Sequence, residues 1–201
     1  MFGGDSPIAG DVLAADGRSA APGLLGDAGF PEENGAVDPA AAAETAALME
    51  VEDVLLGRGG ESLLEEEALR HVITRLTDEG LTIEIFARPG APLWEGEGAE
   101  PRPVTLTLLA AIAHAAGMVT NPVAVAAHVP ARPVMAMGTA PWDRSIARAQ
   151  RTRLALEQAG LAASRMARVT GHADRSPATA DPSAPRNDRV EITLLRRFPA
   201  R

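Results

Sequence analysis

Apolar and polar side chains alternate along two neighbouring runs in the first half of the chain. Residues 71–76 (HVITRL) and 81–86 (LTIEIF) show this two-residue period, which is typical of a β-strand with one buried face. Between them stands Asp78-Glu79-Gly80, and an acidic segment that ends in glycine is a frequent turn sequence. The pattern therefore predicts a β-hairpin.

Apolar residues at three- and four-residue spacing predict helices elsewhere. The first helix opens at Asp38-Pro39 and places Leu48, Val51 and Leu55 on one side. Further helices are predicted over residues 61–69, 104–119 (with an end at Gly117) and 142–160. The side of the last helix that is expected to pack consists of Ser145, Ala149, Thr152, Leu156 and Ala159.

Three more short apolar runs predict strands, and the order of the elements predicts the fold. These runs are residues 122–129, 165–173 and 189–196. Two of the predicted helices lie between strands that are expected to run parallel to each other. We therefore predict an α/β (α+β) sandwich, in which helices cover one face of a mixed β-sheet.

The beginning of the chain differs from the rest in composition. It is rich in Gly, Ala, Pro and Asp, and its few large side chains cannot bury enough apolar surface to offset the entropy lost on ordering. We expect residues 1–40 to be a disordered acidic linker, residues 41–68 a helical linker segment, and residues 69–201 the folded domain.

Charge and composition exclude several classes of protein. The 201 residues include no cysteine, which excludes thiol catalysis, disulfides and thiolate metal sites. Residues 1–50 hold nine carboxylates and one arginine, a net charge of −8, whereas residues 139–201 hold 12 arginines and 6 carboxylates. This local basicity suits an anionic ligand but is too dilute for a nucleic-acid groove, so we predict no nucleic-acid binding. No apolar run is long enough to predict a membrane helix.

The run Gly-His-Ala-Asp at residues 171–174 raises the question of a catalytic or metal site. The four histidines, at positions 71, 114, 128 and 172, fall on four different predicted elements and lack metal-binding spacing. The sequence contains no serine nucleophile motif, no paired catalytic carboxylates and no phosphate-binding glycine loop. We therefore predict a protein that is not an enzyme and that binds no cofactor or metal. His172 and Asp174 are interpreted as strand-end and turn residues.

Several motifs, in order and spacing, resemble the OmpA-like domain of the flagellar motor protein MotB. The motifs are TDEGLTIEIF, PVAVAAHVPARPV, WDRSIARAQ, LAASRMARVTGHADRSP and DPSAPRNDRVEITLL, within residues 70–196. The resemblance implies a periplasmic domain that binds peptidoglycan and holds the stator of the flagellar motor to the cell wall. It also implies a homodimer, tethered to the inner membrane through a membrane segment that joins the stator's ion-channel partner. We expect this sequence to correspond to the periplasmic portion alone.

The resemblance further implies which residues meet the wall. His128 matches the strand-end histidine of the family, and Arg148 matches its helix arginine. The family's ligand-binding aspartate is replaced by Pro130, and the asparagine before the helix tryptophan is replaced by Pro141. The wall peptide carries diaminopimelate, which has a carboxylate and an ammonium group on one carbon. A guanidinium of the protein is expected to bind that carboxylate, and a carboxylate of the protein is expected to bind that ammonium. Loss of the aspartate predicts weak, altered or absent binding unless a neighbour such as Asp143 substitutes for it.

Six residues are therefore expected to bind peptidoglycan: Arg148, His128, Arg144, Arg151, Asn187 and Arg189. The three helix arginines form either an anion-attracting ridge or a solvated face, and His128 is either a ligand or a residue that orients its loop. For Asn187, Arg189 and the neighbouring Arg186, we favour a structural role, in which they hold the loop before the last strand (a loop clamp), over contact with the ligand. Trp94 and Trp142 are expected to pack. The alternative function is an OmpA-like structural or dimerisation domain that has lost peptidoglycan binding.

Overall fold

The computed structural model describes residues 38–58, 63–132 and 140–198. These residues belong to one compact unit, Val37–Arg201. The predicted disordered linker lies outside the described residues except for its last three positions. The elements are α1 (Pro39–Leu56), α2 (Glu66–Leu69), β1 (Val72–Leu76), β2 (Gly80–Phe86), α3 (Pro103–Ala116), β3 (Val123–His128), α4 (Pro141–Gln158), η1 (Ala163–Arg165), β4 (Met166–Gly171), η2 (Pro185–Asn187) and β5 (Arg189–Leu195).

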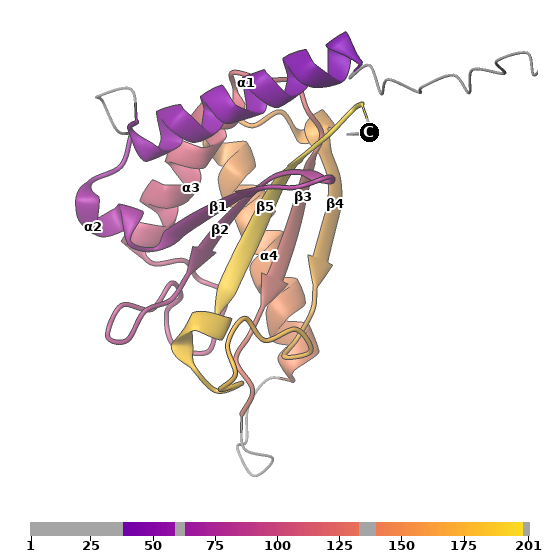
Figure 1. The fold of residues 1–201 in the computed structure, drawn as a ribbon. Helices are drawn as coiled ribbons and strands as arrows, with labels where there is room; N and C mark the ends of the chain where they lie inside the picture. Colours follow the sequence, from indigo (N-terminus) through magenta and orange to yellow (C-terminus); the bar gives the residue numbers. More distant parts are fainter. Residues whose placement is uncertain (1–37, 59–62, 133–139, 199–201) are drawn as a thin grey trace, which may run out of the picture. The chain divides into compact units, whose positions relative to one another are not determined.

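The five strands form one mixed sheet in the order β1-β2-β5-β3-β4 (Figure 1). β1 and β2 make the predicted hairpin, and β5 pairs antiparallel with both β2 and β3. Because β2 and β3 both run antiparallel to β5, they point the same way, and α3 connects them. β3 and β4 pair in parallel and are connected by α4. The prediction that helices link parallel strands is therefore confirmed.

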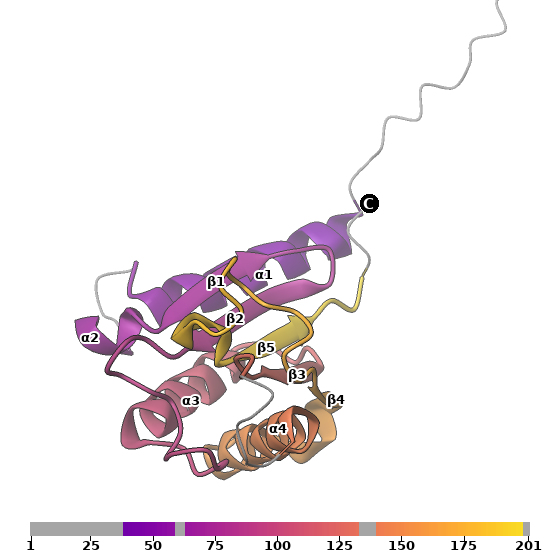
Figure 2. The same cartoon turned by 90° about the horizontal axis from the view of Figure 1, so that it is seen from below.

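One face of the sheet is apolar and is covered by helices. In β2, Leu81, Ile83 and Ile85 are fully buried in the core, whereas the side chains between them point to the other face. α3 and α4 lie next to each other against this apolar face (Figure 2). Burial of each large aliphatic side chain contributes about 1.5–3 kcal/mol. The predicted fold, a mixed sheet with helices on one face, is confirmed.

Helix α1 packs into the same core. Its Leu48, Val51 and Leu55 have no exposed surface and cluster with side chains of the sheet and of α3. Asp38 caps the helix, because its Oδ1 accepts a hydrogen bond from the Ala40 N–H at 2.9 Å. The helix that the sequence assigned to a linker segment, residues 41–68, thus shares its core with the folded domain.

Helix α4 carries the residues of greatest interest, and most of its predicted packing side is correct. Ser145, Ala149, Thr152 and Leu156 are buried, whereas Ala159 lies beyond the helix end and is exposed. The two tryptophans behave differently: Trp94 is fully buried, but Trp142 is 48% exposed on the first turn of α4. The prediction that Trp142 packs was wrong.

The end of β4 lies unusually close to the start of α4. A Cβ atom on Gly171 would be 2.5 Å from the backbone N of Ile146, so no side chain fits there. Beyond the strand, Ala173 adopts a left-handed φ of 52°, and its N–H donates to Ser145 Oγ at 3.0 Å. The Ala173 carbonyl accepts from the Val129 N–H at 3.0 Å. These contacts tie the ends of β3 and β4 to the first turns of α4.

Candidate functional site

Three arginines gather where β3 ends and α4 begins, and we call them the arginine cluster. Arg132 follows β3, whereas Arg144 and Arg148 lie on the buried side of the first two turns of α4. Two carboxylates reach the cluster from other parts of the chain. Asp188 comes from the segment just before β5, and Glu97 comes from the connection between β2 and α3.

Arg148 is held by groups of the protein itself. Its side chain is 4% exposed, and its Nη1 donates to Asp188 Oδ1 at 2.6 Å. Its Nε donates to the carbonyl oxygen of Gly98 at 2.9 Å. The guanidinium carbon lies 5.2 Å from the centroid of the Trp94 ring, within cation–π range. The arginine that the resemblance assigned to the ligand therefore makes a buried ion pair within the chain.

Burial dominates the electrostatics of this pair. Burial lowers the pKa of Arg148, while the nearby Asp188 carboxylate opposes that shift. Burial likewise raises the pKa of Asp188, and here the Arg148 guanidinium opposes the shift. Because both groups have left water, each charge depends on its partner for compensation.

Arg144 is buried as deeply as Arg148, but two of its side-chain nitrogens have no hydrogen-bond partner among the described residues. Its side chain is 2% exposed, and within the described part of the chain neither Nε nor Nη2 has a hydrogen-bond partner. Its Nη1 lies 3.9 Å from Glu97 Oε2, which is beyond hydrogen-bond distance. Burial lowers the pKa of Arg144. Unsatisfied N–H groups of a buried cation are energetically costly, so these donors suit an anionic group from outside the chain.

A short acidic segment covers the cluster, and we call residues 95–100 (EGEGAE) the acidic turn. Its Glu97 forms an ion pair and a hydrogen bond with Arg132 and approaches Arg144. The hydrogen bond from Arg132 lowers the pKa of Glu97. The acidic turn therefore supplies an internal carboxylate to two arginines of the cluster.

The acidic turn also contacts the remaining arginines on this side of α4. Gly98 accepts from Arg148, and Glu100 accepts from Arg151 Nη2 at 2.8 and 3.0 Å. Arg151 is 38% exposed, unlike the buried Arg144 and Arg148. The helix arginines are thus neither an open ridge nor a uniformly solvated face, because Arg144 and Arg148 are buried and Arg151 pairs with the acidic turn.

His128 and Arg189 lie on the other face of the sheet. They are register partners on β3 and β5, at positions whose side chains point away from the helices. The Arg189 Nε donates to Glu191 at 2.9 Å, and the His128 ring stacks on His172 with centroids 4.8 Å apart. The six expected ligand residues therefore do not form one site, because the sheet separates these two from the arginine cluster.

Asn187 is fully buried and holds the loop that precedes β5. Its Oδ1 accepts from the N–H groups of Ala178 and Thr179 at 2.7 and 3.3 Å. Its Nδ2 donates to the Asp181 carbonyl at 2.7 Å and to the Thr179 hydroxyl at 3.3 Å. These bonds use the whole amide group, and they confirm the loop-clamp interpretation for this residue.

His128 is expected to make the domain less stable in mild acid. Burial, then the charges of Arg189 and His172, lowers its pKa from 6.5 to about 3, and Glu84 opposes this only in part. The folded state therefore binds the proton less readily than the unfolded state. The contribution of neutral His128 to the free energy of unfolding is fully present above pH 6.5. It falls as the pH drops toward 3, by up to about 1.4 kcal/mol per pH unit.

Urea unfolding at pH 7.0 and pH 5.5 measures this effect. His128→Gln should lose less stability between the two pH values than the unchanged protein, by roughly 1 kcal/mol. His114→Gln, at an exposed position of α3, is the matched control and should behave like the unchanged protein. An identical pH dependence in the His128 variant would contradict the assignment.

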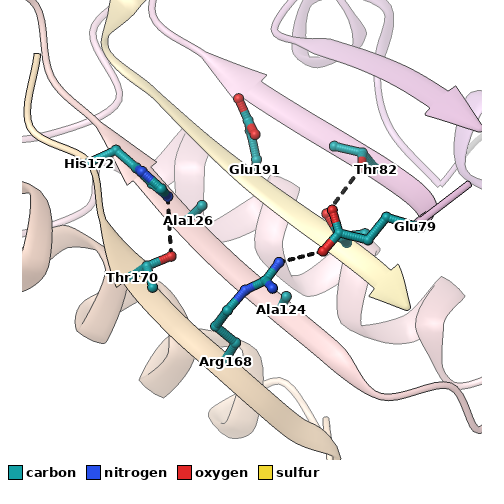
Figure 3. A pocket seen from close by; sticks show the side chains of 9 residues that line it. Glu79, Thr82, Ala124, Ala126, Arg168, Thr170, His172 and Glu191 are labelled. Carbon is teal, nitrogen blue, oxygen red and sulfur yellow. Dashed lines mark hydrogen bonds and ion pairs between the residues drawn. The ribbon is translucent and has the colours of Figure 1, made fainter. Parts of the chain in front are cut away.

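The face of the sheet opposite the helices carries a hollow of about 460 Å³ (Figure 3). Ala124 and Ala126 of β3 lie beneath it, and their small side chains leave the space open. Arg168 of β4 forms an ion pair with Glu79 at 2.5 Å, across the strands that lie between them. His172, which stacks on His128, also lines the hollow.

Sequence reasoning missed the partners of the arginines rather than the arginines themselves. The sequence patterns assign no role to Glu97, Arg132 or Asp188. One signal was present: residues 95–100 hold three glutamates separated by small residues, opposite in sign to the arginine-rich α4. Their contact is set by the tertiary fold.

Two further features bear on the function. In the described part of the chain, no three histidine or acidic side chains converge as a metal site would require. None of the described helices combines the length and the apolar character needed to cross a membrane.

The fold is that of the periplasmic domain of MotB and of a MotB-like protein, and the resemblance found in the sequence is confirmed at the level of the fold. A MotB-like protein from Desulfovibrio vulgaris has a TM-score of 0.58 and 19% identity, covering 78% of this chain and 96% of that one. The periplasmic domain of Helicobacter pylori MotB (residues 78–256) has a TM-score of 0.51 and 16% identity, covering 63% and 83%. The cell wall anchor of the T6SS from Pseudomonas aeruginosa has a TM-score of 0.53 and 27% identity, covering 67% and 99%. No protein-family model and no curated protein sequence matches the chain.

Proposed function

We propose that this domain is a non-catalytic anchor that binds the peptide part of peptidoglycan in the periplasm. One observation carries the proposal: Arg144 is buried beside Arg132 and Arg148 with two N–H donors that no group among the described residues satisfies. A guanidinium in this state is suited to a carboxylate, which accepts charge-assisted hydrogen bonds. The similarity to a solved structure described as a cell wall anchor supports the same conclusion.

The ligand that fits is an amino acid residue with a free carboxylate and a free ammonium, such as diaminopimelate in the wall peptide. Arg144 is the donor available for the carboxylate. Asp188 is the carboxylate closest to Arg148, and it is the group proposed to take the ammonium in place of the aspartate that Pro130 replaces. Arg148 then acts by holding Asp188 in position. Each charge-assisted contact is expected to contribute about 1.5–3 kcal/mol.

The larger assembly is also part of this proposal. From the resemblance to MotB, we propose that the domain works as a homodimer and anchors a flagellar stator. A membrane segment would join it to the inner membrane and to the ion-channel partner. The similarity to the T6SS anchor favours a second candidate, in which the anchored assembly is a secretion system. Both candidates share wall binding as the activity of this domain.

Co-sedimentation with purified peptidoglycan sacculi tests wall binding directly. The unchanged protein should sediment with the sacculi, and Arg144→Gln should weaken binding tenfold or more, because one charge-assisted contact is lost. Arg148→Ala should also weaken binding. Arg148→Ala also leaves the Asp188 charge buried without a partner. The double variant Arg148→Met with Asp188→Leu avoids this, because it removes both charges and fills the space they occupied.

The control for this experiment is Arg153→Gln, on the same helix. Arg153 pairs with Glu157 at 2.7 Å, away from the arginine cluster, so this variant should bind like the unchanged protein. Equal binding by all variants would remove the arginine cluster from the mechanism. Failure of the unchanged protein to sediment would overturn the proposal in favour of a structural or dimerisation domain, for which the internal pairing of Arg148 is the favourable observation.

A further inference from the structure

Glu97 occupies a position suited to a carboxylate of an external ligand. It pairs with Arg132, and its second oxygen lies 3.9 Å from Arg144. Over residues 38–58, 63–132 and 140–198, no other carboxylate lies within 4 Å of either guanidinium. One carboxylate thus serves two guanidiniums, and the Nε and Nη2 donors of Arg144 remain unused.

The two sides of this contact differ in how firmly they are held. Arg144 is buried in the first turn of α4, whose close approach to β4 fixes its backbone. The Glu97 side chain is 49% exposed, and its partner Arg132 is 35% exposed. An exposed ion pair of this kind contributes little to stability. The carboxylate is therefore the exchangeable side of the contact, and Arg144 is the fixed side.

The backbone around Glu97 suits such an exchange. Gly96 precedes it with a left-handed φ of 56°, and Gly98 follows it. Glycine restricts the backbone less than any other residue, so the acidic turn has glycine on both sides of the residue that would move. The Gly98 carbonyl, in contrast, is bonded to Arg148, which anchors one side of the turn while the Glu97 side chain swings out.

We infer that Arg132 and Arg144 form an anion subsite for a carboxylate group, and that Glu97 fills this subsite when no ligand is bound. The inference rests on the proposed function for the identity of the ligand, a wall peptide with a free carboxylate. It goes further by assigning the carboxylate to the Arg132–Arg144 subsite, and by making Glu97 an internal competitor that sets the affinity.

Competition has a measurable consequence. A ligand binds only the fraction of molecules in which Glu97 has left the subsite, so its apparent affinity is reduced by that fraction. Removal of the Glu97 charge should therefore tighten binding of a carboxylate. Most substitutions in a binding site weaken binding, so a gain in affinity is a specific signature of this arrangement.

Acetate is the probe for the subsite, because it presents a carboxylate and nothing else. Binding is followed through the Nε–H resonance of Arg144 in ¹⁵N-labelled protein at constant ionic strength, with chloride replaced by acetate. In Glu97→Gln, this resonance should shift and saturate, with an affinity at least fivefold tighter than in the unchanged protein. Glu100→Gln, on the same turn but paired with Arg151, is the matched control and should respond like the unchanged protein.

A second set of measurements separates this inference from the proposed function. The tripeptide L-Ala–D-Glu–diaminopimelate should also bind Glu97→Gln at least fivefold more tightly, and addition of Arg144→Gln should abolish that gain. Acetate binding that is equal in Glu97→Gln and in the unchanged protein, or absent from both, would overturn the anion subsite. If acetate bound more tightly to Glu97→Gln, as expected, but neither sacculi nor the tripeptide bound, the result would instead overturn the proposed ligand and leave the anion subsite intact.

Discussion

Asp188→Ala is expected to lower the free energy of unfolding by about 3 kcal/mol, because it leaves the Arg148 guanidinium buried without its partner. The two side chains are 16% and 4% exposed, and the ion pair between them is 2.6 Å long. For a domain of this size, such a loss lowers the melting temperature by roughly 6–12 °C. Thermal and urea unfolding followed by circular dichroism measure both quantities.

The control is a second change at the partner position. In Asp188→Leu with Arg148→Met, no charge is left uncompensated, so the double variant should recover most of the lost stability. The partly exposed i,i+4 pair of Arg153 and Glu157 provides a comparison on the same helix, where removal of one partner should cost only about 0.5 kcal/mol. If Asp188→Ala lowered the free energy of unfolding by less than about 1 kcal/mol, the ion pair would behave as a solvated surface pair, which would contradict its burial.

Gly171→Ala is expected to destabilise the domain by a similar amount, about 3 kcal/mol, through overpacking. The added Cβ would lie 2.5 Å from the backbone N of Ile146 and 2.5 Å from Ser145 Oγ. A side-chain atom can rotate away, but the backbone of α4 cannot move without shifting the helix. Urea unfolding measures the loss, and the same shift should weaken the hydrogen bond from the Ala173 N–H to Ser145.

Amide hydrogen exchange at Ala173 reports on that hydrogen bond directly. Its exchange should be faster in Gly171→Ala than in the unchanged protein. Gly98→Ala is the matched control, because a Cβ there meets the Glu95 carbonyl oxygen at 3.5 Å and the Glu100 N at 3.9 Å, which are ordinary contacts. A Gly171→Ala protein with unchanged stability would show that β4 and α4 can separate more easily than their contact implies.

The sequence predicted the fold well because its signals are local. The alternation of Leu81, Ile83 and Ile85 defined both the strand and its buried face, and the turn before Leu81 defined the hairpin. The position of β5 between β2 and β3 is not a local property. It depends on the pairing of β5 with β2, more than a hundred positions earlier, and with β3, more than sixty positions earlier, and hydrophobic periodicity does not encode such pairing.

The candidate site was predicted only in part for the same reason. Arg148 was located through the resemblance, and Asn187 was interpreted correctly as a loop clamp. The burial of Arg144 and its contact with Glu97 depend on how the acidic turn lies against α4, which composition does not reveal. Trp142 was expected to pack because tryptophan usually does, but the side of a helix that it occupies overrides that preference.

The central place of β5 has a consequence for how the chain acquires its structure. The β1–β2 hairpin and the β3–α4–β4 unit are each built from contacts between neighbours in the sequence, but within the sheet they meet only through β5. The two halves are therefore joined across the sheet by the strand that leaves the ribosome after all the others. Until it arrives, β2 and β3 each present an open edge, and unpaired strand edges are prone to intermolecular pairing. In the completed sheet, β5 pairs with both of these edges.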